Sequence, residues 1–158
     1  MSGWIAAALS AALIPTAAAQ PTPEPHQLPN NPDDYYAAAV DFAKCSANWQ
    51  FASETATLHN LKETATAFGD TARGWRVAGM FFLVESMAPQ AQPRAGETFD
   101  FLVSAHLQTL RANRELYGDR ADQEAIEEIK RVCTPWSETQ EAIIGAMRRS
   151  LPATPEDQ

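Results

Sequence analysis

The sequence is poor in basic residues, and the few that it has are dispersed. Lysine and arginine together number 12, against 20 aspartate and glutamate residues, which gives a formal net charge of −8. The densest basic pair is Arg148 and Arg149, and two charges do not make the patch that phosphate binding requires. The same balance repels anionic lipid headgroups. The composition therefore argues against a protein that binds nucleic acid.

Three long-range patterns are also missing. After the N-terminal region, no stretch reaches the roughly 18 apolar residues that a transmembrane helix needs. No segment alternates apolar and polar residues as a half-buried strand does, and no internal repeat occurs. Hydrophobic residues nevertheless make up 45% of the 158 residues, which is too high for a disordered chain. These features indicate one helical domain without a membrane span in the mature chain.

Catalytic signatures are absent as well. The chain has no GxSxG, no HExxH and no glycine-rich phosphate loop, and its seven glycines are scattered singly. No CxxC pair occurs, which excludes the common dithiol redox motif and thioether-bound haem. Two carboxylates, Glu54 and Glu85, lie in apolar stretches, where we expect Arg73, Arg76 or solvent to meet them. We assign no catalytic residue, and an enzyme built from scattered residues stays open.

The N-terminus has the pattern of an export signal. Residues 1–19 read MSGWIAAALSAALIPTAAA, and the uncharged run from Trp4 to Ile14 has the length of a signal-peptide hydrophobic region. Pro15 ends the run, and the alanines that follow suit signal peptidase. The segment before the run departs from the pattern, because it carries no lysine or arginine. We expect cleavage after Ala19 and a periplasmic or secreted protein. The alternative is an alanine-rich N-terminus that is retained.

The rest of the chain divides into three parts. Residues 20–32 contain five prolines in thirteen positions. Proline fixes φ and lacks a backbone donor, so we expect an extended, mobile lead-in. Residues 33–151 form the helical domain, and residues 152–158 form a short, flexible acidic tail.

Apolar residues at helical spacing predict the elements of the domain. The segment NPDD at 31–34 is a typical helix start, with acceptor side chains and negative charge near free N–H groups. The first helix is expected over about 33–68, apolar on two sides, with a bend or break near His59 and Asn60. Gly69 is expected to close it, and Asp70 to cap the next helix.

The later helices follow from the same pattern and from their terminating residues. The second is expected over about 71–87, the third over about 97–117 with Gly118 as its C-cap, and the fourth over about 120–133. Thr134 is expected to cap a last helix whose core face carries Trp136, Ile143, Met147 and Leu151. The sequence therefore predicts an all-α protein, a compact bundle of four to five helices with one disulfide.

The disulfide is predicted from Cys45 and Cys133, both at apolar helical positions. In an exported chain, two cysteines and no others most simply form a bridge. It would tie the first helix to the C-terminal pair and close a loop of about 90 residues, worth about 4–5 kcal/mol before strain. Two separate buried thiols are the alternative.

Three histidines provide weak hypotheses for a metal or cofactor. His59 and Glu63 are four residues apart, so on one helix both would address a metal ion from the same face. His26, in the lead-in, would add a ligand. His106 falls on the buried stripe of the third helix, where haem held without covalent attachment would need such a side chain. A solvated helix face and a packed core histidine are the ordinary alternatives, and we expect no cofactor.

Trp49 is the candidate partner-binding residue. It shares the second apolar strip of the first helix with Cys45, beyond what a simple bundle must bury. A large apolar side chain left at the surface usually marks a partner site, although core packing is the ordinary role of such a residue. We therefore expect a small exported binding or accessory protein that acts through a helical surface on an unknown protein or small molecule. A metal- or cofactor-binding bundle is the alternative.

Overall fold

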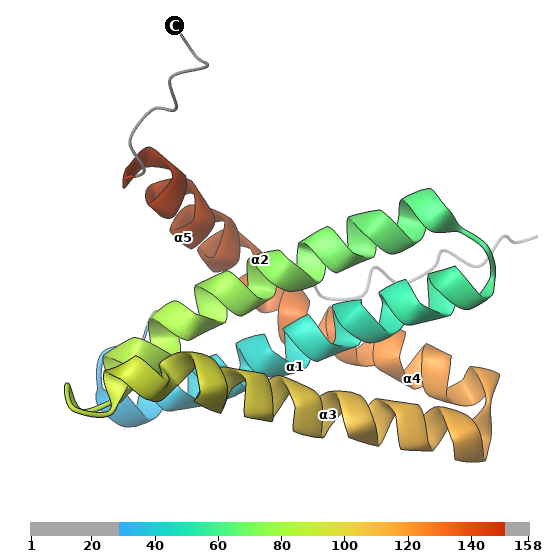
Figure 1. Ribbon diagram of the computed structural model, residues 1–158, viewed down its shortest axis with the longest axis horizontal. Coiled ribbons are helices and arrows are strands. Elements are labelled where there is room, and N and C mark those ends of the chain that lie inside the picture. Colours follow the sequence, from blue (N-terminus) through green and yellow to red (C-terminus); the bar gives the residue numbers. More distant parts are fainter. Residues whose placement is uncertain (1–28, 151–158) are drawn as a thin grey trace, which may run out of the picture.

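The computed structural model describes residues 29–150, which fold into helices with no strand among them. The predicted signal peptide, most of the proline-rich lead-in and the acidic tail lie outside the described residues. Figure 1 shows α1 (Pro32–Leu58), α2 (Lys62–Ser86), α3 (Ala95–Tyr117), α4 (Asp119–Glu128) and α5 (Ser137–Ser150). The all-α class and the expected four to five helices are confirmed. Within this range, no helix has both the length and the apolarity to cross a bilayer.

α1 begins where the sequence predicts, but it ends at Leu58, so the prediction of one helix over about 33–68 is wrong and residues 62–68 belong to α2. The Asn31 side-chain oxygen accepts a hydrogen bond from the backbone N–H of Asp34 at 3.0 Å, which caps the helix. The expected break near His59 is confirmed, because α1 stops at Leu58 and α2 starts at Lys62. Asn60 turns the chain with φ of 60°, a left-handed conformation that asparagine adopts more readily than most residues.

α2 continues through Gly69, so the prediction that Gly69 closes one helix and Asp70 caps the next is wrong. Glycine inside a helix costs some stability, so packing against α1 must compensate for it here. A Cβ at Gly69 would lie 3.6 Å from the hydroxyl oxygen of Ser53 on α1. That hydroxyl donates to the carbonyl of Ala65 on α2 at 2.6 Å. The contact between α1 and α2 thus overrides the local signal of the glycine.

The chain passes from α4 to α5 without leaving helical conformation, so Thr134 is not the predicted N-cap. Its backbone is right-handed helical, with φ of −55° and ψ of −43°. The helix instead widens to a π turn, η2 (Ile129–Cys133), and then tightens to a 3-10 turn, η3 (Thr134–Trp136). Pro135 explains the change, because it has no N–H for the carbonyl four residues earlier and its ring crowds that carbonyl.

α1 is the central helix, and both of its predicted apolar strips contribute buried residues. Figure 1 shows α2 returning antiparallel to α1, with α3 beside α1 and α4 leading back across the hairpin to α5. An aromatic cluster fills the centre of the bundle. The ring centroid of Phe42 lies 4.9 Å from those of Trp75 and Phe82, and 5.5 Å from that of Trp136.

α5 contributes less to the core than its sequence pattern predicts. Trp136, just before it, is buried, but none of the residues of α5 itself is fully buried. Ile143 packs against the edge of the core and Met147 is half-buried. Leu151, the last residue of the predicted core face, lies outside the described residues. The bundle is therefore held mainly by α1 to α4.

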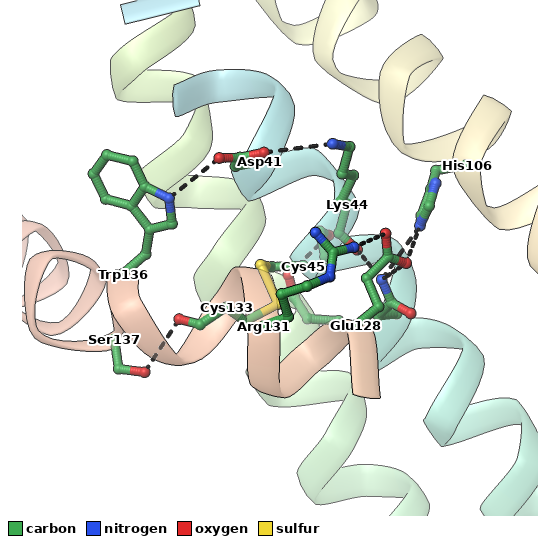
Figure 2. Close-up of a disulfide and its surroundings, with 12 residues drawn as sticks. Asp41, Lys44, Cys45, His106, Glu128, Arg131, Cys133, Trp136 and Ser137 are labelled. Atoms are coloured by element: carbon green, nitrogen blue, oxygen red, sulfur yellow. Dashed lines mark hydrogen bonds and ion pairs between the residues drawn. A yellow bond between two sulfur atoms is a disulfide. The ribbon is translucent and has the colours of Figure 1, made fainter. Parts of the chain in front are cut away.

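Cys45 on α1 and Cys133 at the end of η2 form the predicted disulfide, with Cα atoms 5.6 Å apart (Figure 2). The two residues are 88 positions apart and both are buried. In the chain-entropy model, closing such a loop stabilises the fold by about 4–5 kcal/mol. The bridge holds the π turn against the middle of α1, one helical turn before Trp49.

Candidate binding groove

A largely apolar groove lies between the C-terminal half of α1, the beginning of α2, and α4. Its volume is about 430 Å³. Large apolar side chains from all three sides line it: Trp49, Phe51, Leu61, Phe68, Ile126 and Ile129. We call it the Trp49 groove, because it contains the residue that the sequence singled out for partner binding.

Small side chains leave the space that the groove occupies. Ala52 and Ala56 line it from α1, and Ala125 lines it from α4. Helical spacing places Ala52 and Ala56, three and seven residues after Trp49, on the same face of α1 as Trp49. The turn between α1 and α2 adds His59 and Leu61 to the lining. The groove thus results from alanines placed where α1, α2 and α4 would otherwise pack side chain against side chain.

Trp49 is half-buried, and its indole nitrogen has no hydrogen-bond partner among the described residues. The indole packs against Phe68 of α2, with ring centroids 5.2 Å apart. Its Nε1 is shielded by protein and unpaired. Buried tryptophans usually find a partner for this N–H. Trp136 does so, because its Nε1 donates to Asp41 at 3.4 Å. Among residues 29–150, the other buried side-chain polar atom without a partner is the Asn48 oxygen.

The rim of the groove exposes large aliphatic side chains. Leu61 is 53% exposed and Ile126 is 51% exposed, and both line the groove. Leu58, at the adjoining end of α1, is 70% exposed. Single exposed aliphatic residues are ordinary, but a cluster around an apolar hollow usually marks a contact surface.

Most polar side chains around the groove already have partners within the protein. The guanidinium of Arg114 pairs with Asp122 at 2.9 Å and lies 3.7 Å above the ring centroid of Phe51. The ammonium group of Lys130 pairs with Glu127 at 2.9 Å. The groove therefore offers little uncompensated charge to a ligand.

A polar cluster lies beside the groove, where α1, α3 and α4 meet. Figure 2 shows the His106 ring facing Glu128, with a distance of 2.8 Å from Nε2 to the carboxylate. The Asn48 side-chain amide donates to the same carboxylate at 2.9 Å and to the carbonyl of Lys44 at 3.0 Å. Because those two bonds use both amide protons, His106 Nε2 is best assigned as the protonated ring nitrogen, donating to Glu128.

These contacts control the ionisation of Glu128. The hydrogen bond from His106 lowers the pKa of Glu128 to about 2, against the opposing effect of burial. The hydrogen bond from Asn48 and the nearby charges of His106 and Arg131 act in the same direction. Glu128 is therefore ionised at neutral pH and joins three helices. The Asn48 side-chain oxygen, by contrast, is buried without a partner among residues 29–150.

The structure does not support the geometry behind the predicted metal ligands. His59 follows the end of α1 and Glu63 lies in the first turn of α2, so they do not share one helical face, and that premise is wrong. His26 lies outside the described residues. His106 is mostly buried, as expected, with 21% of its side chain exposed, and its Nε2 is bonded to Glu128. Among residues 29–150, no group of three or more histidine, cysteine, aspartate or glutamate side chains is arranged to hold a metal ion.

Some contacts of the charged residues were not anticipated. Glu54 pairs with Arg111 of α3 at 2.6 Å, and not with an arginine of α2. Arg76 pairs instead with Asp100 at 2.7 Å, and Glu85 is exposed to solvent, as one of the expectations had it. One feature of the sequence does point to the polar cluster: Asn48 is a polar residue within an apolar stretch of α1, where a hydrogen-bonded partner is expected.

The groove thus contains one residue that the sequence predicted for partner binding, Trp49. The other large residues of its lining come from separate elements and meet only in the folded chain. Phe68 and Leu61 come from α2 and its preceding turn, and Ile126 comes from α4. No family model, curated protein or solved structure matches this chain.

Proposed function

We propose that this protein is an exported, non-enzymatic binding protein that holds its partner in the Trp49 groove. The observation that carries the proposal is the groove itself, with the half-buried Trp49 inside and the half-exposed Leu61 and Ile126 at its rim. Covering the exposed half of an aliphatic side chain of this size contributes about 0.8–1.5 kcal/mol. A partner that covers both rim residues would therefore gain a useful binding energy from them alone.

The chemistry of the lining supports binding rather than catalysis. The groove is walled mainly by carbon atoms; His59 and Asp122 are the lining residues best able to act as a general base, and Asp122 is already paired with Arg114. The ionised Glu128 lies beside the groove and already accepts from His106 and Asn48. These bonds suit a structural role for Glu128, which holds α4, one side of the groove, against α1 and α3.

Export is supported by the leader-like N-terminus and by the disulfide. The bridge between Cys45 and Cys133 closes a long loop of the domain, and such bridges persist in oxidising compartments. Fractionation of the producing cells tests this part of the proposal. We expect the mature chain outside the cytoplasm, beginning at Gln20. Recovery of the full-length chain in the cytoplasm would contradict export.

Site-specific photo-crosslinking tests the groove. Ile126 is replaced by p-benzoylphenylalanine, and the chain is irradiated in the cells that produce it. The matched control carries the same residue in place of Phe101, an α3 side chain that is 71% exposed and does not line the groove. We expect an adduct from position 126, seen as a defined increase in mass, and none from position 101. Equal adducts at both positions, or none at either, would overturn the proposal.

A further inference from the structure

Resting on the proposed function, we infer that the Trp49 groove binds an uncharged, apolar small molecule that carries a hydrogen-bond acceptor for Trp49 Nε1. The inference combines the size of the groove, the pairing of the charged side chains that line it, and the unpaired indole N–H of Trp49, a lining residue.

The size of the groove suits a small molecule. Ligand pockets usually measure about 300–1,000 Å³, and the groove, at about 430 Å³, lies in the lower part of that range. A partner helix is about 10–12 Å across with its side chains. It would rest on the rim and fill the groove only with single side chains. A compact ligand would instead contact Trp49, Phe68 and Ile129 together.

The charges around the groove indicate that the ligand is neutral. Asp122 is neutralised by Arg114, and Lys130 by Glu127. A charged ligand would lose its hydration and find its counter-charge already paired, and such desolvation is costly. A neutral apolar ligand avoids this cost and gains from covering the lining.

The acceptor is inferred from the unpaired nitrogen of Trp49. A buried donor without a partner is unfavourable, so a ligand that supplies an acceptor removes a cost that the free protein carries. Protein covers the nitrogen in the free groove. The ligand therefore reaches it only when the indole, or the Phe68 ring packed against it, turns aside. Both rings line the groove and contact each other, so the ligand must part them to form this bond.

Three probes of matched size test the ligand class: butyrophenone, butylbenzene and phenylbutyrate. They present the same carbon skeleton length with a carbonyl, with no polar group, and with a negative charge. We expect butyrophenone to bind roughly three- to tenfold more tightly than butylbenzene, the gain of one net hydrogen bond. Phenylbutyrate should bind most weakly. In ¹⁵N–¹H spectra, butyrophenone should shift the indole N–H signal that Trp49→Phe removes.

Two variants separate the hydrogen bond from the groove. Trp49→Phe keeps an aromatic ring but lacks the donor, so it should bind butyrophenone and butylbenzene equally. Ile126→Lys, at the rim, should weaken butyrophenone and butylbenzene alike, and thermal unfolding of each variant verifies that it is folded.

The results that would contradict the inference are distinct from those that would contradict the proposed function. Equal binding of ketone and hydrocarbon by the unaltered protein, with an unmoved indole signal, would overturn the inference while the groove remained a binding site. Tightest binding of phenylbutyrate would overturn it too. If no probe bound and the adduct at position 126 were a protein, the inference would fail and the proposed function would stand. If no adduct formed either, both would fail.

Discussion

At the scale of single residues, Glu128 determines how the region beside the groove responds to acid. Its carboxylate accepts hydrogen bonds from His106 of α3 and Asn48 of α1, and its side chain is 19% exposed. Because the pKa falls from its ordinary 4.5 to about 2 in the folded protein, the folded state binds a proton less readily than the unfolded state. The resulting stabilisation is present above about pH 4.5 and is lost as the pH falls toward 2.

This linkage predicts the behaviour of Glu128→Gln. At pH 7 the variant should be less stable than the unaltered protein by about 1–2 kcal/mol, allowing for solvent screening of a partly exposed pair. The difference should shrink between pH 4.5 and pH 2. Urea denaturation across this range measures it. The control is Glu127→Gln, at a carboxylate that is 71% exposed. A constant difference for Glu128→Gln, parallel to that of the control, would contradict the account.

The sequence predicts isolated residues better than it predicts contacts between them. Cys45 and Cys133 could be paired because no other cysteine competes. Trp49 could be singled out because it lies on a second apolar strip. The pairing of Glu128 with Asn48, 80 positions away, could not be predicted, because it depends on the rotation of α4 against α1. Periodicity shows which face of a helix is apolar, but not which residue of a neighbouring helix it meets.

At the scale of the elements, one glycine sets how closely α2 approaches its neighbours. A Cβ at Gly79 would lie 2.7 Å from the Cβ of Phe42 on α1, and closer still to the ring of Phe99 on α3. These side chains are buried, so they have little room to move. Gly96, near the start of α3, has open space at the corresponding position.

Substitution of each glycine by alanine should affect the stability of the fold differently. Gly79→Ala should destabilise the fold by about 1–3 kcal/mol, because overpacking outweighs the higher helix propensity of alanine. Gly96→Ala should leave stability unchanged or raise it by up to about 1 kcal/mol. Free energies of unfolding from urea titrations test both. Equal effects of the two substitutions would show that α1, α2 and α3 do not meet at Gly79 as described.

Helix boundaries were predictable where a local signal acted alone. Asn31, the turn at Asn60 and the C-cap Gly118 all lie where the sequence indicates. Gly69 and Thr134 carry equally clear local signals, and both are overridden. At Gly69, close packing of α1 on α2 keeps the helix intact. At Thr134, the chain adapts to Pro135 by a π turn and a 3-10 turn rather than by a break.

At the scale of the whole molecule, the disulfide links the stability of the fold to the wall of the groove. Cys133 ends the π turn that begins at Ile129, and Ile129 lines the groove. Cys45 lies one turn before Trp49 on α1. The bridge thus fixes two sides of the groove to each other, and removing it should affect both stability and binding.

The double variant Cys45→Ala/Cys133→Ala tests this link. We expect it to be less stable than the oxidised protein by about 2–5 kcal/mol. It should also bind butyrophenone more weakly. Addition of dithiothreitol should destabilise the unaltered protein and leave the double variant unchanged, which separates the disulfide from other effects of the reductant. Equal unfolding free energies of the oxidised protein and the double variant would refute the link.

The fold class was predictable from whole-chain properties, whereas the groove was not. The absence of alternating segments and the helical spacing of apolar residues sufficed for an all-α bundle with one bridge. The groove depends on alanines of α1 and α4, such as Ala52 and Ala125, coming to line the same space. That placement follows from the turn at Asn60 and the path of α4, which short-range patterns do not determine.

Native mass spectrometry most directly tests the claim that the Trp49 groove is the binding site. The protein, Ile126→Lys and Phe101→Lys are purified from the cells that normally produce the chain, without denaturation. We predict that the unaltered protein and Phe101→Lys carry the same bound small molecule and that Ile126→Lys does not. Equal loading of all three, or loss from Phe101→Lys alone, would contradict the claim.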